Sequence, residues 1–132
     1  MSRLVVTDAS VVVDLLGRFS PEPIEAILFE PGTRLLAPEL LDIEVLNALR
    51  RLEMLGMVPA QRQTEVLDDF RALRIRRFRH AVLRQDIWRL RSNLTAYDAC
   101  YVALARQSGA ALVTRDERLA KAPDLGIEIE VP

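Results

Sequence analysis

The stretch LVVTDAS, residues 4–10, places a short run of apolar and β-branched side chains directly before an aspartate and a serine. Residues 4–7 have the composition of a buried strand, while Asp8 and Ser10 are side chains that commonly begin helices. We therefore predict a strand followed at once by a helix over residues 11–16, ending near Gly17. The three consecutive valines in that helix favour a strand almost as strongly.

The alternation of strand and helix continues along the chain, because prolines and glycines separate the apolar segments. We predict helices over residues 21–29, 38–55, 59–73, 81–91 and 95–108, and strands over residues 34–37, 111–114 and 127–131. Residues 74–79 fit either an edge strand or a loop. Strands separated by helices favour a mostly parallel sheet covered on both faces, so we expect a three-layer α/β/α sandwich.

The chain has 132 residues, of which 50% are hydrophobic and 28% charged, and this suits one globular domain over residues 1–132. No segment approaches the roughly 20 consecutive apolar residues of a membrane helix. Asp8 stands where a signal peptide would be apolar. We therefore expect a soluble cytoplasmic protein with no membrane partner.

Soft metal ligands are scarce in this sequence. Cys100 is the only cysteine and His80 the only histidine, which excludes an internal disulfide and leaves too few ligands for a structural zinc site. Oxygen atoms must therefore hold any metal. Mg²⁺ and Mn²⁺ are the cations that carboxylate and water ligands suit best.

The formal net charge of -1 argues against binding nucleic acid through overall charge. The 18 basic residues include one lysine, Lys121, and arginines are frequent over residues 71–91. This segment is either a solvated surface or a strip that binds RNA phosphates, which the planar arginine fork suits well. Trp88 within it marks either a partner surface or a side chain partly buried against a neighbouring helix.

Two aspartates follow predicted strands. Asp8 comes directly after the first strand, and Asp116 lies two residues beyond Thr114 at the end of another. In open α/β sheets the functional crevice lies at the carboxyl ends of the strands, so the two side chains can meet there. Each is also a common residue for a helix cap or a turn, which leaves a purely structural role open.

Two further acids lie on predicted helices. Asp98 shares a largely apolar face with Tyr101 and Val102, where a carboxylate is costly unless it is hydrogen-bonded or bound to a metal. Its alternative role is in a capping box with Thr95. Glu44 lies at the edge of the apolar stripe of its helix and, taken singly, fits a rim residue better than a ligand.

Taken together, these acids can converge at one end of the sheet. Carboxylates within ~4 to 6 Å of one another raise each other's pKa unless a cation neutralises them, so the cluster is either partly protonated or a divalent-metal site. We favour the metal site. A bound Mg²⁺ can activate a water for attack on a phosphodiester and stabilise the developing charge, which makes a histidine base unnecessary.

Three segments, in order along the chain, resemble the motifs of the PIN-domain family. Residues 5–10, VVTDAS, resemble the opening motif. Residues 95–105, TAYDACYVALA, are similar to the third-acid helix of the VapC toxins, and residues 112–119, LVTRDERL, resemble the closing T-x-D motif. The resemblance covers essentially the whole chain. Cys100 stands where such helices often have a plain apolar residue, and a buried thiol can pack in the same way.

The resemblance implies a PIN-like fold and an endoribonuclease that uses Mg²⁺ or Mn²⁺ as the toxin of a toxin-antitoxin pair. The residues that it implies for the acidic centre and its support are Asp8, Glu44, Asp98, Asp116, Ser10 and Thr114. We expect Asp8 and Asp98 to be the most direct metal ligands and Asp116 to be a ligand or a support through water. We expect Glu44 to orient the attacking water. The family also implies an RNA substrate, a homodimer and a VapB antitoxin that masks the acids.

Two other folds also gather acids at strand ends. A phosphoacceptor receiver domain needs paired acids after the first strand and a lysine at a late strand end, whereas Ala9 follows Asp8 and the one lysine is Lys121. A phosphatase of the haloacid dehalogenase type needs a second aspartate where Ser10 stands. The alternatives that remain are a PIN-like domain that binds RNA or a protein partner without cleavage, and a nuclease that acts on structured DNA.

Overall fold

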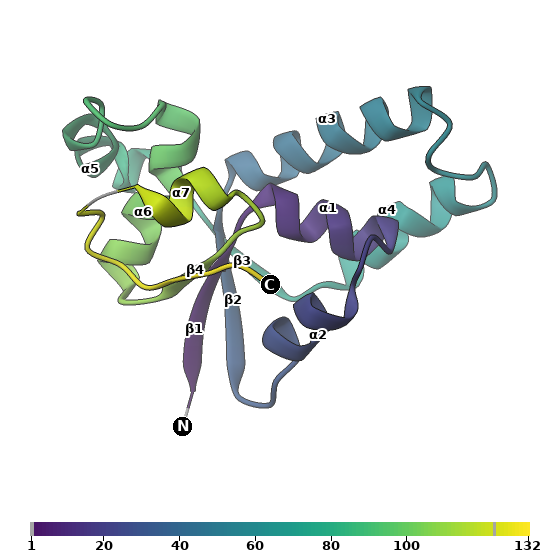
Figure 1. Cartoon of the computed structure of the whole chain (residues 1–132), viewed down its shortest axis with the longest axis horizontal. Coiled ribbons are helices and arrows are strands. Elements are labelled where there is room, and N and C mark those ends of the chain that lie inside the picture. The colour runs from purple at the N-terminus through teal and green to yellow at the C-terminus, as the bar shows by residue number, and fades with distance from the viewer. Residues whose placement is uncertain (1, 123) are drawn as a thin grey trace.

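A parallel sheet forms the centre of the protein (Figure 1). The structure is a computed structural model that describes residues 2–122 and 124–132. The strands are β1 (Arg3–Thr7), β2 (Thr33–Pro38), β3 (Ile75–Phe78), β4 (Ala111–Val113) and β5 (Ile129–Glu130), in the spatial order β3-β2-β1-β4-β5. Each neighbouring pair is parallel, as the alternation of strands and helices predicts.

Helices cover both faces of this sheet (Figure 1). They are α1 (Ala9–Gly17), α2 (Glu22–Leu28), α3 (Leu40–Met54), α4 (Arg62–Ala72), α5 (Arg84–Arg89), α6 (Ala96–Ser108) and α7 (Glu117–Lys121), with a short 3₁₀ helix, η1 (His80–Val82). Val5 and Val6 are neighbours in β1 and point to opposite faces, and both are fully buried. The predicted three-layer α/β/α sandwich is therefore confirmed. Over residues 2–122 and 124–132, no helix combines the length and apolar character needed to cross a bilayer.

Several elements differ from the prediction. The helix predicted over residues 81–91 is confirmed only in part: α5 covers residues 84–89, and η1 precedes it, with a turn between them at the fully buried Leu83. Residues 74–79 contain β3, an edge strand. The strand predicted over residues 127–131 is shorter, since only Leu112 and Val113 of β4 pair with it. The sequence did not predict α7.

Two helices begin later than predicted. Pro38 is the last residue of β2, and α3 begins at Leu40, whose backbone N–H donates a hydrogen bond to Nε2 of His80 at 2.9 Å. α4 begins at Arg62, because the backbone first forms a turn in which the N–H of Arg62 donates to the carbonyl of Pro59. Proline therefore precedes both helices without being their first residue.

The strand order reverses at β1. From β1 the chain continues outward through β2 and β3, then returns and places β4 on the other side of β1. In open α/β sheets, crevices form at the carboxyl ends of the strands at such a point. Thr7 and Val113 are register partners there, and the backbone N–H of Asp8 donates to the carbonyl of Val113 at 3.3 Å. The fold therefore brings together the residues that follow β1 and β4.

Candidate active site

Asp8 is buried, whereas the other candidate acids are half-buried. It caps the N-terminus of α1, where its Oδ1 accepts hydrogen bonds from the backbone N–H of Val11 at 3.2 Å and the hydroxyl of Ser10 at 2.6 Å. Its Oδ2 accepts a hydrogen bond from the hydroxyl of Thr114. Burial raises the pKa of Asp8, although these hydrogen bonds act in the opposite direction. The carboxylate is thus held in one orientation.

Ser10 and Thr114 connect Asp8 to the loop after β4. The hydroxyl oxygen of Ser10 accepts the backbone N–H of Arg115 at 3.0 Å, and the hydroxyl oxygen of Thr114 accepts that of Asp116 at 3.0 Å. Both hydroxyls therefore donate to Asp8 and accept from the neighbouring backbone. This network links the end of β1 to the start of α7.

Glu44 reaches the site from α3, where Tyr101 of α6 holds it. The Tyr101 hydroxyl donates a hydrogen bond to Oε1 of Glu44 at 2.6 Å. Burial, followed by this hydrogen bond, raises the pKa of Tyr101, so the phenol stays protonated and remains a donor. After burial, the negative charge of Glu44 is a further cause of the raised pKa of Asp8. The two carboxylates therefore lie in one region.

Asp98 lies in the first turn of α6 and is half-buried. Its backbone N–H donates to Oγ1 of Thr95 at 3.2 Å, so Thr95 caps this helix. The Asp98 carboxylate forms no ion pair within the described part of the chain. Burial raises the pKa of Cys100 to about 12, and the charges of Glu44 and then Asp98 add to this effect. Both acids therefore lie near Cys100.

Asp116 caps α7 and is paired with an arginine. Its Oδ1 accepts the backbone N–H and the Nε–H of Arg118 at 3.0 and 3.2 Å, and its Oδ2 accepts the Nη2–H at 2.9 Å. The side-chain hydrogen bond from Arg118 lowers the pKa of Asp116. The structural role that the sequence left open for Asp8 and Asp116, that of a helix cap, is thus present at both positions.

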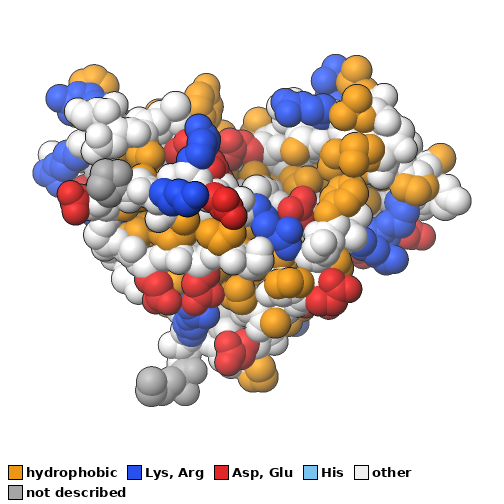
Figure 2. Space-filling model, in the orientation of Figure 1, with side chains coloured by type: hydrophobic (Ala, Val, Ile, Leu, Met, Phe, Trp, Pro, Cys, Tyr) orange, Lys and Arg blue, Asp and Glu red, His pale blue; other side chains and the backbone are white. Residues whose placement is uncertain are grey.

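The predicted residues lie in two adjoining groups. Hydrogen bonds join Asp8 to its two hydroxyl partners, with Glu44 nearby, while Arg118 is paired with Asp116 and is also influenced by the charge of Asp98. In residues 2–122 and 124–132, no three Asp, Glu, His or Cys side chains are close enough to hold one ion among them. Figure 2 shows acidic side chains in the depression between the two upper lobes, beside basic ones. The acids therefore do not form a closed cage by themselves.

The carboxylate ligands of this site fit a hard divalent cation that keeps several of its bound waters. Mg²⁺ in proteins is commonly held by one or two carboxylates together with several waters. A carboxylate has about four lone-pair sites, and Asp8 uses three of them for hydrogen bonds. Among the described residues, no arginine or lysine pairs with Asp8, Glu44 or Asp98. A cation would relieve the repulsion between Asp8 and Glu44.

Sequence analysis missed two side chains of this site. Tyr101 fixes Glu44, and Arg118 pairs with Asp116. Tyr101 could have been identified, because it follows Asp98 by three residues and so shares its helix face. Arg118 carries no comparable signal, since its pairing depends on the start of a helix that the sequence did not predict.

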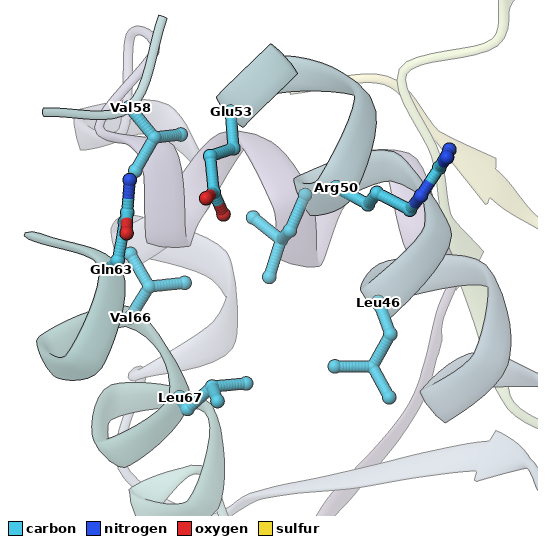
Figure 3. A pocket seen from close by; sticks show the side chains of 8 residues that line it. Leu46, Arg50, Glu53, Val58, Gln63, Val66 and Leu67 are labelled. Atoms are coloured by element: carbon cyan, nitrogen blue, oxygen red, sulfur yellow. The ribbon is translucent and has the colours of Figure 1, made fainter. Parts of the chain in front are cut away.

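A second candidate site is the groove between α3 and α4 (Figure 3). Its lining residues are Leu46, Leu49, Arg50, Glu53, Val58, Gln63, Val66 and Leu67. Leu46 and Leu67 are 44% and 47% exposed. The groove offers one acid, Glu53, so it suits an apolar segment of a protein better than a metal ion.

Comparison with known proteins finds similar sequences along nearly the whole chain. Residues 5–125 match the PIN domain. Ribonuclease VapC1 of Mycobacterium tuberculosis (strain CDC 1551 / Oshkosh) is 40% identical over 129 residues, which cover 96% of this chain and 96% of that protein. Ribonuclease VapC3 of the same strain is 37% identical over 118 residues, which cover 89% of this chain and 86% of that protein.

Solved structures share the fold. PAE2754 from Pyrobaculum aerophilum matches with a TM-score of 0.63 and 26% identity, and the match covers 98% of this chain and 92% of that chain. A chain of VapBC2 from Rickettsia felis, crystallised with a DNA fragment from its promoter, matches with a TM-score of 0.64. That match has 13% identity and covers 97% of this chain and 98% of the other, so it concerns the fold alone.

Proposed function

This chain belongs to the PIN-domain family, and from that premise we propose that it is a metal-dependent endoribonuclease acting as the toxin of a toxin-antitoxin pair. The observation that carries the proposal is the fixed, buried carboxylate of Asp8 beside Glu44, which no basic side chain of the described residues neutralises. The ribonuclease relatives support the same chemistry. The reaction is hydrolysis of an RNA phosphodiester by water.

Asp8 and Asp98 are the residues that would hold Mg²⁺ or Mn²⁺ most directly. Hydrogen bonds from Ser10, Val11 and Thr114 prevent the Asp8 carboxylate from rotating and leave it one lone pair. Asp116 serves as a ligand or as a support through water, and its pairing with Arg118 favours the second role. A bound cation of this kind supplies an activated water and stabilises charge on the phosphate.

Glu44 orients the attacking water and accepts its proton. Tyr101 holds Oε1 of Glu44 from a buried position, which leaves Oε2 to accept a hydrogen bond from the water. A carboxylate with one oxygen fixed presents the other in a defined direction. The role of Tyr101 is therefore to position Glu44.

We infer the remaining partners from membership of the family. The substrate is RNA, the protein forms a homodimer, and a VapB-type antitoxin binds it in the cytoplasm. The relatives named ribonuclease VapC support the RNA substrate, and their family name is the reason for proposing a VapB-type antitoxin. The exposed leucines of the α3–α4 groove, Leu46 and Leu67, offer an apolar segment of the antitoxin a surface to cover.

The test is cleavage of RNA by the purified chain with Mn²⁺ or Mg²⁺ and with excess chelator. We expect cleavage with either metal, none with chelator, and none from Asp8→Asn or Asp98→Asn. Asp68→Asn is the matched control, because the Asp68 side chain is 64% exposed on α4 and should be dispensable. Cleavage that survives both site substitutions or the chelator would contradict the assignment. Binding of RNA without cleavage, or preferential cleavage of structured DNA, would support the corresponding alternative.

A further inference from the structure

Arg118 contacts both oxygens of the Asp116 carboxylate. Its guanidinium approaches as a fork, with Nε on Oδ1 at 3.2 Å and Nη2 on Oδ2 at 2.9 Å, while its backbone N–H also reaches Oδ1. Both oxygens are therefore engaged by one residue. A cation at Asp116 would be repelled by this guanidinium and would compete with it for the carboxylate.

The Arg118 side chain is free to leave. It is 84% exposed, and among the described residues its only ion pair is the one with Asp116. Exposed pairs of this kind are weak, because water screens the charges and both side chains lose freedom in forming them. The contact therefore blocks Asp116 without locking it.

A released Arg118 would stand beside the acids that bind the metal. α7 begins directly after Asp116, so the arginine is anchored two residues from that carboxylate. Asp98 also acts on its charge. A planar guanidinium donates two parallel hydrogen bonds to phosphate as readily as to carboxylate.

We propose that Arg118 is the mobile cation of this site, which pairs with Asp116 in the metal-free protein and moves to an RNA phosphate when metal and substrate bind. The inference rests on the proposed function and assigns Arg118 as a substrate-positioning residue. It predicts effects of opposite sign when Arg118 is removed. Metal binding becomes tighter because a competitor is lost, while RNA binding becomes weaker because a phosphate contact is lost.

The first measurement is the Kd for Mn²⁺, which is determined from the electron paramagnetic resonance signal of the free ion. Arg118→Ala should bind Mn²⁺ about twofold to tenfold more tightly than the wild type, since one positive charge near the site is removed. Arg118→Lys should show a smaller gain, because it keeps the charge but loses the fork. This readout does not depend on catalysis.

The second measurement is the KM for a short single-stranded oligoribonucleotide at saturating Mn²⁺, over a range of salt concentrations. Arg118→Ala should raise KM about threefold to tenfold, and the slope of log KM against log salt should fall by about 0.7, the value for one phosphate contact on a single strand. Arg34→Ala is the matched control, because Arg34 is exposed near the start of β2, at the edge of the sheet opposite the strand end that precedes Asp116. It should change neither constant.

The outcomes separate this inference from the proposed function. Wild-type protein that binds no Mn²⁺, or binds it equally well after Asp8→Asn, overturns the proposed function and the inference with it. The inference alone is overturned if the wild-type protein binds Mn²⁺ through Asp8, and Arg118→Ala either leaves the Kd for Mn²⁺ and the KM for RNA unchanged or raises both. Tighter Mn²⁺ binding together with a higher KM and a lower salt slope supports it.

Discussion

The hydroxyl of Thr114 donates a hydrogen bond to Oδ2 of Asp8, although the two residues are 106 positions apart in the chain. Thr114 directly follows β4 and Asp8 directly follows β1, so this contact joins two neighbouring strand ends. The same hydroxyl oxygen accepts the backbone N–H of Asp116. One side chain therefore sets the geometry of two acids.

Thr114→Val should destabilise the protein by about 1–3 kcal/mol, because Asp8 loses a donor and the backbone N–H of Asp116 loses its acceptor in a buried position. Thr7→Val is the matched control. Thr7 is equally buried, but its hydroxyl reaches only the carbonyl of Asp8 at a long 3.4 Å. Urea unfolding of both variants checks this, and equal losses of stability would contradict the assigned role of Thr114.

Asp8→Asn should remove the pH dependence that Asp8 gives to the stability of the metal-free protein, while abolishing cleavage. An amide nitrogen cannot accept a hydrogen bond, so the variant also loses one of the contacts that the two carboxylate oxygens make, at every pH. Burial raises the pKa of Asp8 above that of the unfolded chain. The folded state therefore binds more protons than the unfolded state between the two values, and stability falls as pH rises through that window. The asparagine has no charge to bury and escapes this loss.

Melting temperatures in chelator from pH 4 to pH 8 test the effect of Asp8→Asn. The variant should gain most over the wild type at the upper end of the range, and the difference should shrink on acidification as Asp8 becomes protonated. Adding Mn²⁺ should raise the melting temperature of the wild type but not of the variant. A difference in melting temperature between the two proteins that does not change from pH 4 to pH 8 would refute the argument.

Tyr101→Phe should lower kcat by about tenfold, because Glu44 loses the donor that fixes Oε1 and its proton-accepting oxygen is no longer held in one direction. The Kd for Mn²⁺ should stay within about twofold of the wild type, since Asp8 and Asp98 are untouched. Single-turnover cleavage and metal titration measure the two quantities. Loss of metal binding with unchanged kcat would place Glu44 among the ligands instead.

Cys100 should resist alkylation in the folded protein at pH 8. It is 2% exposed, and burial raises the pKa of its thiol to about 12, so the reactive thiolate is rare. Its thiol also donates a hydrogen bond to the carbonyl of Tyr97 at 3.1 Å. Mass spectrometry after treatment with iodoacetamide, with and without guanidinium chloride, checks this. Rapid labelling of the folded chain would show that α6 opens near Asp98.

The layered fold could be predicted because it depends on features that are local in sequence. Residues 4–6 are apolar, so both faces of the strand are apolar, and the strand precedes a capping aspartate, which predicts a strand followed by a helix. The boundaries around Leu83 could not be predicted in this way. Its burial, which interrupts the expected helix, depends on the packing of segments distant in sequence.

The candidate site likewise has features that the sequence could predict and features that it could not. The positions of Asp8 and Asp116 after strands were readable, and the structure places both at neighbouring strand ends. The exposed Arg118, however, pairs with Asp116 only because α7 begins there. From the sequence alone, an arginine at this position is expected to be exposed to solvent and to have no particular partner. Partners of that kind are set by three-dimensional placement and carry no periodicity.

The central position of β1 also affects how the protein is made. A ribosome adds Thr114 after Asp8 and 106 residues later, so a polypeptide that still lacks β4 has β1 paired on one side only, and Asp8 lacks the hydrogen bond from Thr114. Nuclease activity would therefore arise only after Thr114 has been added. The topology of the sheet would thus delay activity until both neighbours of β1 are present.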